Sequence, residues 1–129
     1  MGVTQLHATV ESALDPHTDA LAGEWLSLQQ VTERLGIKPG RTKQLLAERR
    51  LLAIRRDGRP MVPAAFIKDG QVIKGLSGTL TLLSDAGFDD VETLRWLFTA
   101  DDTLPGTPVQ ALSENRGTEV RRRAQALAF

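Results

Sequence analysis

The chain has 129 residues, of which 41% are hydrophobic and 25% are charged, and it contains no cysteine. A chain of this length can bury one compact core or two small ones, and the lack of cysteine excludes disulfides and thiolate metal sites. The formal net charge is zero, yet residues 33–59 hold nine Lys and Arg against three acids, a net of +6. The charge is therefore segregated along the chain.

The first 23 residues contain three acids, several Ser and Thr and one Pro, but no Lys or Arg. This composition predicts a flexible acidic tail over residues 1–23. His7 and His17 lie in it without neighbouring ligand residues, so we expect no metal site and no cofactor. The tail lacks a signal-peptide pattern and no apolar run reaches about 20 residues, which favours a cytoplasmic protein with no membrane insertion.

The segment "EWLSLQQVTERLG" predicts a short helix. Leu28, Val31 and Leu35 fall on one helical stripe, Ser27 can cap its start, and Gly36 stands where a left-handed residue ends a helix. We expect regular structure to begin here, near residue 24.

The next segment, "IKPGRTKQLLAERR", predicts a second short helix after a tight turn, with Pro39 in its first turn. Leu45 and Leu46 can face inward. The outward positions would then carry Arg41, Lys43 and Gln44, a basic and polar face of the kind that enters a DNA major groove.

The segment "LLAIRRDGRPMVP" predicts a two-stranded hairpin, because Asp57-Gly58 suits a turn in which both residues have positive φ. Pro60 has no N–H and therefore belongs on an edge strand or at the start of a strand. The tip of this hairpin would carry three arginines, Arg55, Arg56 and Arg59.

The remaining residues predict helices at about 77–86, after Asp89, after Thr107 and from about Thr118. The predicted fold class is mainly α with a small β-hairpin: a winged helix-turn-helix over 24–67, followed by a C-terminal helical bundle over 68–129. Helix capping and solvation explain the acid pairs Asp89-Asp90 and Asp101-Asp102, and no catalytic motif is present. We therefore predict that the chain is not an enzyme.

The stretch "LSLQQVTERLGIKPGRTKQLLAERRLLAIRRDGRPMVP" resembles the winged helix-turn-helix of the MerR and excisionase type. It departs from that pattern at Thr32, where the family favours Ala, at Lys38, where a capping Ser is usual, and at Arg49, where Gly is common. The resemblance implies binding to double-stranded DNA through the second helix and the wing.

Three further segments, "GQVIKGLSGTLTLLSDAGFDD", "TLRWLFTADDTL" and "EVRRRAQALAF", resemble a small actinobacterial family of DNA-binding proteins described as substrates of membrane Ser/Thr protein kinases. This resemblance implies a kinase partner and a phosphorylated Thr in the N-terminal tail. Thr9 is the nearest match, with Thr4 and Thr18 remaining open.

An alternative comes from residues 95–128, which resemble the toxin-binding region of Xre-type antitoxins and imply a protein partner or self-association through the C-terminal helices. Aromatic residues at helical spacing usually belong to a core, so Trp96, Leu97 and Phe98 could instead form the core that joins the two halves. Our first interpretation is a DNA-binding protein, a transcriptional regulator or nucleoid-type binder. Its predicted DNA contacts are Lys38, Arg41, Thr42, Lys43, Gln44, Arg50, Arg55, Arg56 and Arg59.

Overall fold

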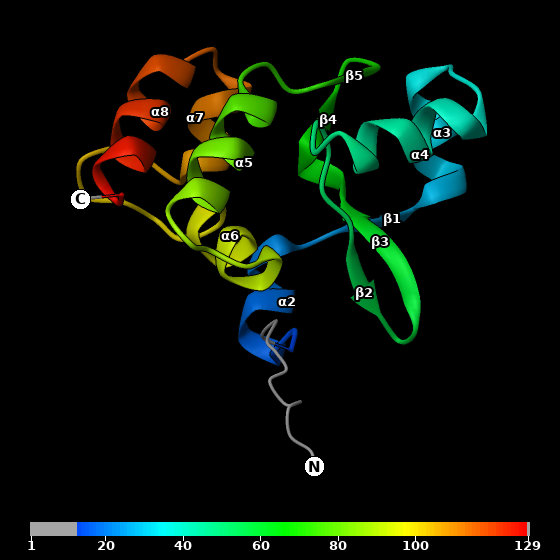
Figure 1. The fold of residues 1–129 in the computed structure, drawn as a ribbon, viewed down its shortest axis with the longest axis horizontal. Helices are drawn as coiled ribbons and strands as arrows, with labels where there is room; N and C mark the ends of the chain where they lie inside the picture. Colours follow the sequence, from blue (N-terminus) through cyan, green and yellow to red (C-terminus); the bar gives the residue numbers. More distant parts are fainter. Residues whose placement is uncertain (1–12, 129) are drawn as a thin grey trace.

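The computed structural model describes residues 13–128, which form two groups of elements (Figure 1). The short helices α3 and α4 and a small sheet lie on the right of the view, and helices α5 to α8 lie on the left. The order helix, turn, helix, hairpin and then helices confirms the predicted fold class. None of the described helices is long and apolar enough to cross a membrane.

The N-terminal part of the described chain is not a tail. Helix α2 spans Pro16–Ala22, and the prediction of flexibility through residue 23 is therefore wrong for these residues. Asp15 caps the helix by accepting from the Thr18 backbone N–H, Pro16 opens it and Gly23 ends it with φ 74°. The helix is fixed because it packs against α6 and buries Thr18 and Ala22.

The two helices of the helix-turn-helix follow the predicted signals. Helix α3 spans Leu28–Leu35, its cap Ser27 forms a reciprocal capping box with Gln30, and Gly36 is left-handed at φ 65°. Helix α4 spans Pro39–Ala47, with Pro39 in the first turn. Its N-cap, Lys38, makes no side-chain capping bond, because a lysine side chain has no hydrogen-bond acceptor.

The sheet has three strands rather than two. Strands β2 (Ile54–Arg56) and β3 (Arg59–Pro63) form the predicted hairpin, called here the wing hairpin. Strand β1 (Trp25–Ser27) pairs with the other side of β3, so β3 is central. Pro60 is tolerated because β1 pairs only from Met61 onward, which leaves Pro60 facing β2 alone.

A short link connects the sheet to the C-terminal helices. It contains a 3-10 turn at Ala64–Phe66 and a second, unpredicted two-stranded ladder of β4 (Ile67–Lys68) and β5 (Gln71–Val72). Backbone bonding continues beyond this ladder, because Ile73 donates to the Phe66 carbonyl at 2.9 Å. The link thereby holds Phe66 in the interior.

The C-terminal part comprises α5 (Leu76–Asp85), α6 (Asp90–Leu97), α7 (Pro108–Ser113) and α8 (Gly117–Ala126). Asp89 and Glu92 form the expected capping box of α6, and Thr107 caps α7. Helices α5 and α8 pack side by side, as Figure 1 shows, so these four helices bury one another's apolar stripes.

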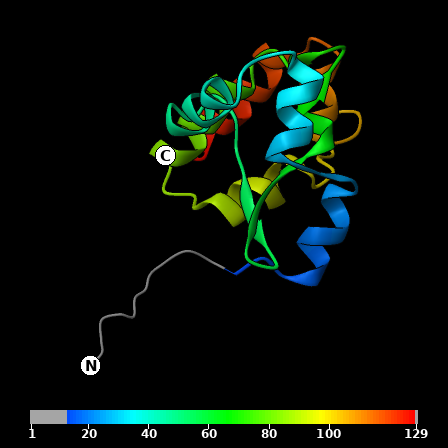
Figure 2. The ribbon, with the colours of Figure 1, turned by 90° about the vertical axis from the view of Figure 1, so that its right-hand side faces the viewer.

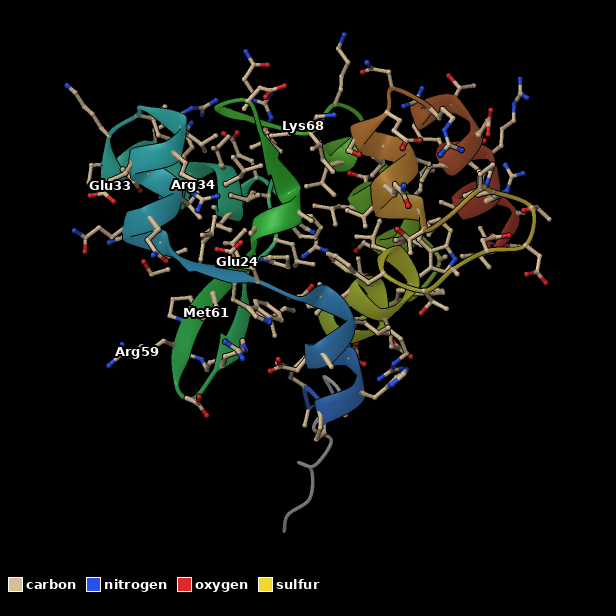
Figure 3. All side chains as sticks on the ribbon, turned by 180° about the vertical axis from the view of Figure 1, so that it is seen from behind. Glu24, Glu33, Arg34, Arg59, Met61 and Lys68 are labelled. Carbon is tan, nitrogen blue, oxygen red and sulfur yellow. The ribbon has the colours of Figure 1, made fainter. Side chains whose placement is uncertain are left out.

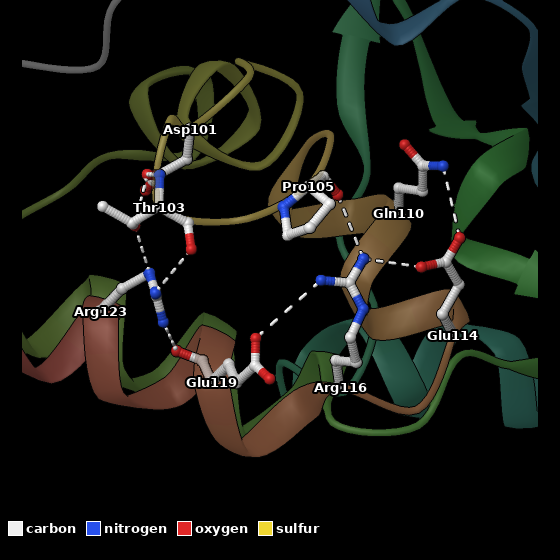
Figure 4. Close-up of polar contacts among 8 residues, drawn as sticks. All are labelled: Asp101, Thr103, Pro105, Gln110, Glu114, Arg116, Glu119 and Arg123. Atoms are coloured by element: carbon white, nitrogen blue, oxygen red, sulfur yellow. Dashed lines mark hydrogen bonds and ion pairs between the residues drawn. The ribbon is translucent and has the colours of Figure 1, made fainter.

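Two arginines fasten the loop between α6 and α7 (Figure 4). Arg123 donates to the side chain of Thr103 at 2.6 Å and to its carbonyl at 2.9 Å. Arg116 donates to the Pro105 carbonyl at 3.1 Å and to Glu114 at 2.6 Å. Both arginines are engaged within the C-terminal part and are not displayed as a free basic surface.

One hydrophobic core joins the two groups of elements. Phe66, which is fully buried, contacts Phe98 at a ring-centroid distance of 5.8 Å. Leu97 is also buried, while Trp96 is half-buried. This aromatic segment therefore contributes to the core that links the two halves, one of the two roles predicted for it.

Because the core is shared, we expect Phe66→Ala to destabilise the whole described fold by about 3–5 kcal/mol. Urea unfolding followed by circular dichroism should give one transition, shifted as a unit. Leu127→Ala, at an exposed position, is the control and should change stability by no more than about 0.5 kcal/mol. Two transitions, only one of them shifted, would contradict the shared core.

Candidate nucleic-acid interface

The outward face of α4 is polar and partly self-paired. Lys43 and Gln44 are exposed, as is Lys38 at the N-cap. Glu48 accepts a hydrogen bond from Gln44 at 2.9 Å and lies 3.9 Å from Arg41, whose side chain is 41% exposed. The predicted residues Lys38, Arg41, Lys43 and Gln44 are thus accessible on α4 or at its N-cap, and Glu48 offsets part of the positive charge of Arg41.

Thr42 does not belong to this face. It is 1% exposed, and its hydroxyl lies 2.6 Å from that of Thr32 on α3. The prediction that Thr42 contacts DNA is wrong, because its position on the helix directs it at α3. The hydroxyl pair instead joins the two helices, and Thr32 bonds back to the Leu28 carbonyl at 2.8 Å.

The two arginines after α4 differ in their surroundings. Arg49 has a left-handed φ of 55° and donates to Asp90 at the start of α6 at 3.1 Å. Arg50, by contrast, is exposed and has no ion-pair partner among residues 13–128. Arg49 therefore binds the C-terminal helices, while Arg50 is free to meet a ligand.

The wing hairpin turns as its sequence predicts. Asp57 and Gly58 have φ 50° and 77°, the positive values that a two-residue turn between twisted strands requires. Arg59 extends from the hairpin (Figure 3), and both Arg55 and Arg59 are exposed. Arg55 donates to the Gly58 carbonyl at 2.8 Å, which keeps its guanidinium at the turn.

Arg56 lies differently from its two neighbours. Its guanidinium binds both carboxylate oxygens of Asp19 on α2, at 2.8 and 3.1 Å, and lies 4.8 Å from the centre of the Trp25 ring. These hydrogen bonds lower the pKa of Asp19 and raise that of Arg56. The prediction of an exposed Arg56 at the tip is wrong, because alternation along β2 turns it toward α2.

A second charged cluster lies at the start of α2. Arg95 on α6 donates to Asp15 at 2.8 Å and to the Thr18 hydroxyl at 3.1 Å, and this hydroxyl donates in turn to Asp15 at 2.9 Å. The Thr18 backbone N–H and the Arg95 side chain hold the pKa of Asp15 well below its usual range. Thr18 is fully buried and is therefore inaccessible to a kinase, whereas Thr4 and Thr9 lie outside the described residues.

Five cations of the helix-turn-helix and wing are exposed without an ion-pair partner in the part of the chain that the structure describes: Lys38, Lys43, Arg50, Arg55 and Arg59. Figure 2 shows α4 beside α3, with the wing hairpin projecting below both helices. A cationic helix and a cationic hairpin arranged in this way can bind a polyanion.

Sequence reasoning missed the residues that organise this surface: Asp19, Trp25, Asp90 and Arg95. Asp19, Asp90 and Arg95 lie far in sequence from the arginines or acids that they bind, so no local spacing reveals them. A local signal did exist for α2, because Asp15-Pro16 is a cap followed by a favoured first residue.

Two family descriptions match this chain. Residues 13–67 match "DNA-binding protein Rv2175c, wHTH domain", and residues 73–128 match "Rv2175c C-terminal domain of unknown function". The matched segments correspond to α2 through the wing hairpin and to the four C-terminal helices.

A curated relative and a solved structure agree with these matches. The chain is 42% identical to the DNA-binding protein Rv2175c of Mycobacterium tuberculosis, with 79% of each chain covered. It is also similar to the NMR structure of Rv2175c, with a TM-score of 0.76 and 36% identity over 99% of this chain and 96% of that one.

The lowered pKa of Asp15 predicts a pH dependence of stability. A carboxylate whose folded pKa lies below its unfolded value of about 3.9 stabilises the fold above that pH and loses this contribution as the pH falls. We expect Asp15→Asn to be less stable than the parent protein at pH 7, with the gap closing toward about pH 2.

Urea midpoints measured at several pH values test this expectation. Asp102→Asn, at an exposed loop carboxylate outside the cluster, is the matched control and should follow the parental pH profile. A gap between Asp15→Asn and the parent that stays constant as the pH falls would show that the carboxylate charge is not involved.

Proposed function

We propose that this chain, which belongs to the Rv2175c family of winged helix-turn-helix proteins, binds double-stranded DNA and acts as a transcriptional regulator or nucleoid-type binder. The main supporting observation is the set of exposed cations without an ion-pair partner among residues 13–128, located on or next to α4 and on the wing hairpin: Lys38, Lys43, Arg50, Arg55 and Arg59. Unpaired surface cations of this kind can neutralise phosphates and release counterions.

Within this proposal the parts of the surface have different roles. The α4 side chains Arg41, Lys43 and Gln44 would approach base edges in the major groove, because they project from a helix narrow enough to enter it. Arg55 and Arg59 on the hairpin, with Lys38 and Arg50, would meet phosphates or the minor groove.

The alternative of an antitoxin-like module finds less support. A helix that docks a protein partner usually presents a cluster of large apolar side chains. Among residues 13–128, Leu127 alone is a large apolar residue classed as exposed, at 40%. The apolar stripes of α5 to α8 pack against one another and are buried. DNA is therefore the proposed partner.

Salt dependence gives the sharpest test of the DNA contacts. If about six phosphates are neutralised, log affinity for a random duplex should fall against log salt with a slope of about −5. Arg50→Ala and Arg59→Ala, which remove proposed phosphate contacts, should each weaken binding and reduce that slope by about 1. Gel-shift titrations at several salt concentrations measure both quantities.

Arg122→Ala is the matched control, because Arg122 is exposed on α8, at the opposite side of Figure 1 from α4. It should leave the affinity and slope unchanged. A wild-type slope near zero, or equal effects of all three substitutions, would refute the proposed interface.

We further propose that phosphorylation of Thr9 by a Ser/Thr kinase weakens DNA binding. Ala13 and Leu14 line a hollow of about 510 Å³ together with Arg55, Gly58 and Pro60 of the wing hairpin. Thr9 is four residues from Ala13, a reach of at most about 14 Å. A phosphate there adds about −1.5 to −2 charges within reach of the cationic hairpin.

Accordingly, Thr9→Glu should lower DNA affinity and flatten the salt slope, because the added charge competes with phosphates of the duplex. Thr9→Ala is the control and should bind like the parent protein. Fluorescence anisotropy of a labelled duplex measures both variants. Unchanged affinity and slope for Thr9→Glu would argue against control at Thr9.

A further inference from the structure

Helix α6 contacts segments that lie next to the two elements of the proposed DNA interface, α4 and the wing hairpin. At its start, Asp90 accepts from Arg49, which directly follows α4 and Glu48, at 3.1 Å. In its last turn, Arg95 binds Asp15 at 2.8 Å and Thr18 at 3.1 Å. One helix of the C-terminal part thus contacts α2 and the end of α4, the proposed recognition helix.

Helix α2 carries the connection on to the wing. Asp19 follows directly after Thr18 and binds Arg56 of β2 through two hydrogen bonds, of 2.8 and 3.1 Å. The Arg56 guanidinium also lies 4.8 Å from the Trp25 ring centre, and Trp25 belongs to β1, which pairs with β3. Arg56 is therefore held by an acid of α2 and by an aromatic ring of the sheet.

The contacts of Arg56 are more consistent with a residue that positions the wing hairpin than with a residue that binds DNA. The side chains of Arg56 and Asp19 are 29% and 32% exposed, and a two-pronged arginine–carboxylate pair uses the donors that a phosphate would need. Moving Arg56 to DNA would leave Asp19 with an unpaired, partly buried charge. On the wing hairpin, the arginines that remain available to DNA are the exposed Arg55 and Arg59.

Arg49 gives an independent sign of the same role. Its φ of 55° is a conformation that glycine adopts without strain and other residues rarely adopt. An arginine there costs backbone energy, and its contact with Asp90 offsets that cost. The side chain is thus used for a contact between the two halves of the chain.

We propose that the C-terminal helices, through α6 and α2, fix the wing relative to the recognition helix, and that Arg49 and Arg56 are positioning residues rather than DNA contacts. Holding the two elements in place before DNA arrives lowers the ordering cost of binding. The DNA part of this inference rests on the proposed function, while its mechanical part does not.

Amide hydrogen exchange tests the mechanical part without DNA. Arg95→Ala, whose side-chain bonds go to Asp15 and Thr18 on α2, should speed exchange of the β2 and β3 amides by about three- to tenfold. Arg122→Ala is the control and should leave them unchanged. If Arg95→Ala does not fold, Asp19→Asn takes its place. Unchanged exchange in a folded variant overturns the proposal.

DNA titrations then separate positioning from contact. Arg56→Ala and Arg49→Gly should lower affinity by about three- to tenfold with the salt slope unchanged, because neither removes a phosphate contact. Glycine at position 49 adopts the left-handed backbone readily, so this variant removes the side-chain contact without adding backbone strain. Arg59→Ala, the contact control, should instead reduce the slope by about 1.

The reversed pair Asp19→Arg with Arg56→Asp should recover part of the affinity lost in either single variant, which a DNA contact would not do. A slope reduced by Arg56→Ala as much as by Arg59→Ala, or tighter binding by Asp19→Asn, overturns the proposal. If the parent protein shows no salt-dependent binding, the proposed function fails while the exchange result still decides the positioning.

Discussion

The contact of Phe66 with Phe98 joins the helix-turn-helix to the C-terminal helices in one core, and the candidate interface depends on it. Helices α3 and α4 have eight and nine residues, too few to be stable alone in water. Their stability must come from tertiary packing, and Val31 and Leu45 supply it by entering the same buried cluster as Phe66. The position of α4 therefore depends on the packing of this core.

Selective pairing reconciles the zero net charge of the chain with a locally cationic surface. Asp19 and Asp90, on elements outside the helix-turn-helix, bind the inward arginines Arg56 and Arg49. The outward cations, such as Lys43 and Arg59, have no such partner among residues 13–128. Overall neutrality and a locally cationic surface are thus compatible, because a polyanion responds to the local field rather than to the sum.

Capping and turn chemistry carried the predictions that succeeded, since these signals are local. Ser27, Gly36, Asp57-Gly58 and Asp89 each act within about four residues of themselves. Strand β1 was missed because three residues show no period, and only pairing with β3 makes them a strand. Helix α2 lies in a segment whose acidic composition favours a flexible tail, and its local signal is limited to the cap at Asp15 and the Pro that follows it.

The candidate site was predictable as a region but not residue by residue. The charge cluster locates α4 and the hairpin, yet whether an arginine faces outward depends on acids from distant elements. The same distinction applies in the C-terminal part, where Arg95 is bound to α2 while Arg116 and Arg123 fasten a loop. An arginine with a well-placed acceptor serves the fold, and one without such a partner is available to a ligand. Counting basic residues in the sequence therefore overestimates the number of cations available to a ligand, because the fold pairs some of them with acids from distant elements.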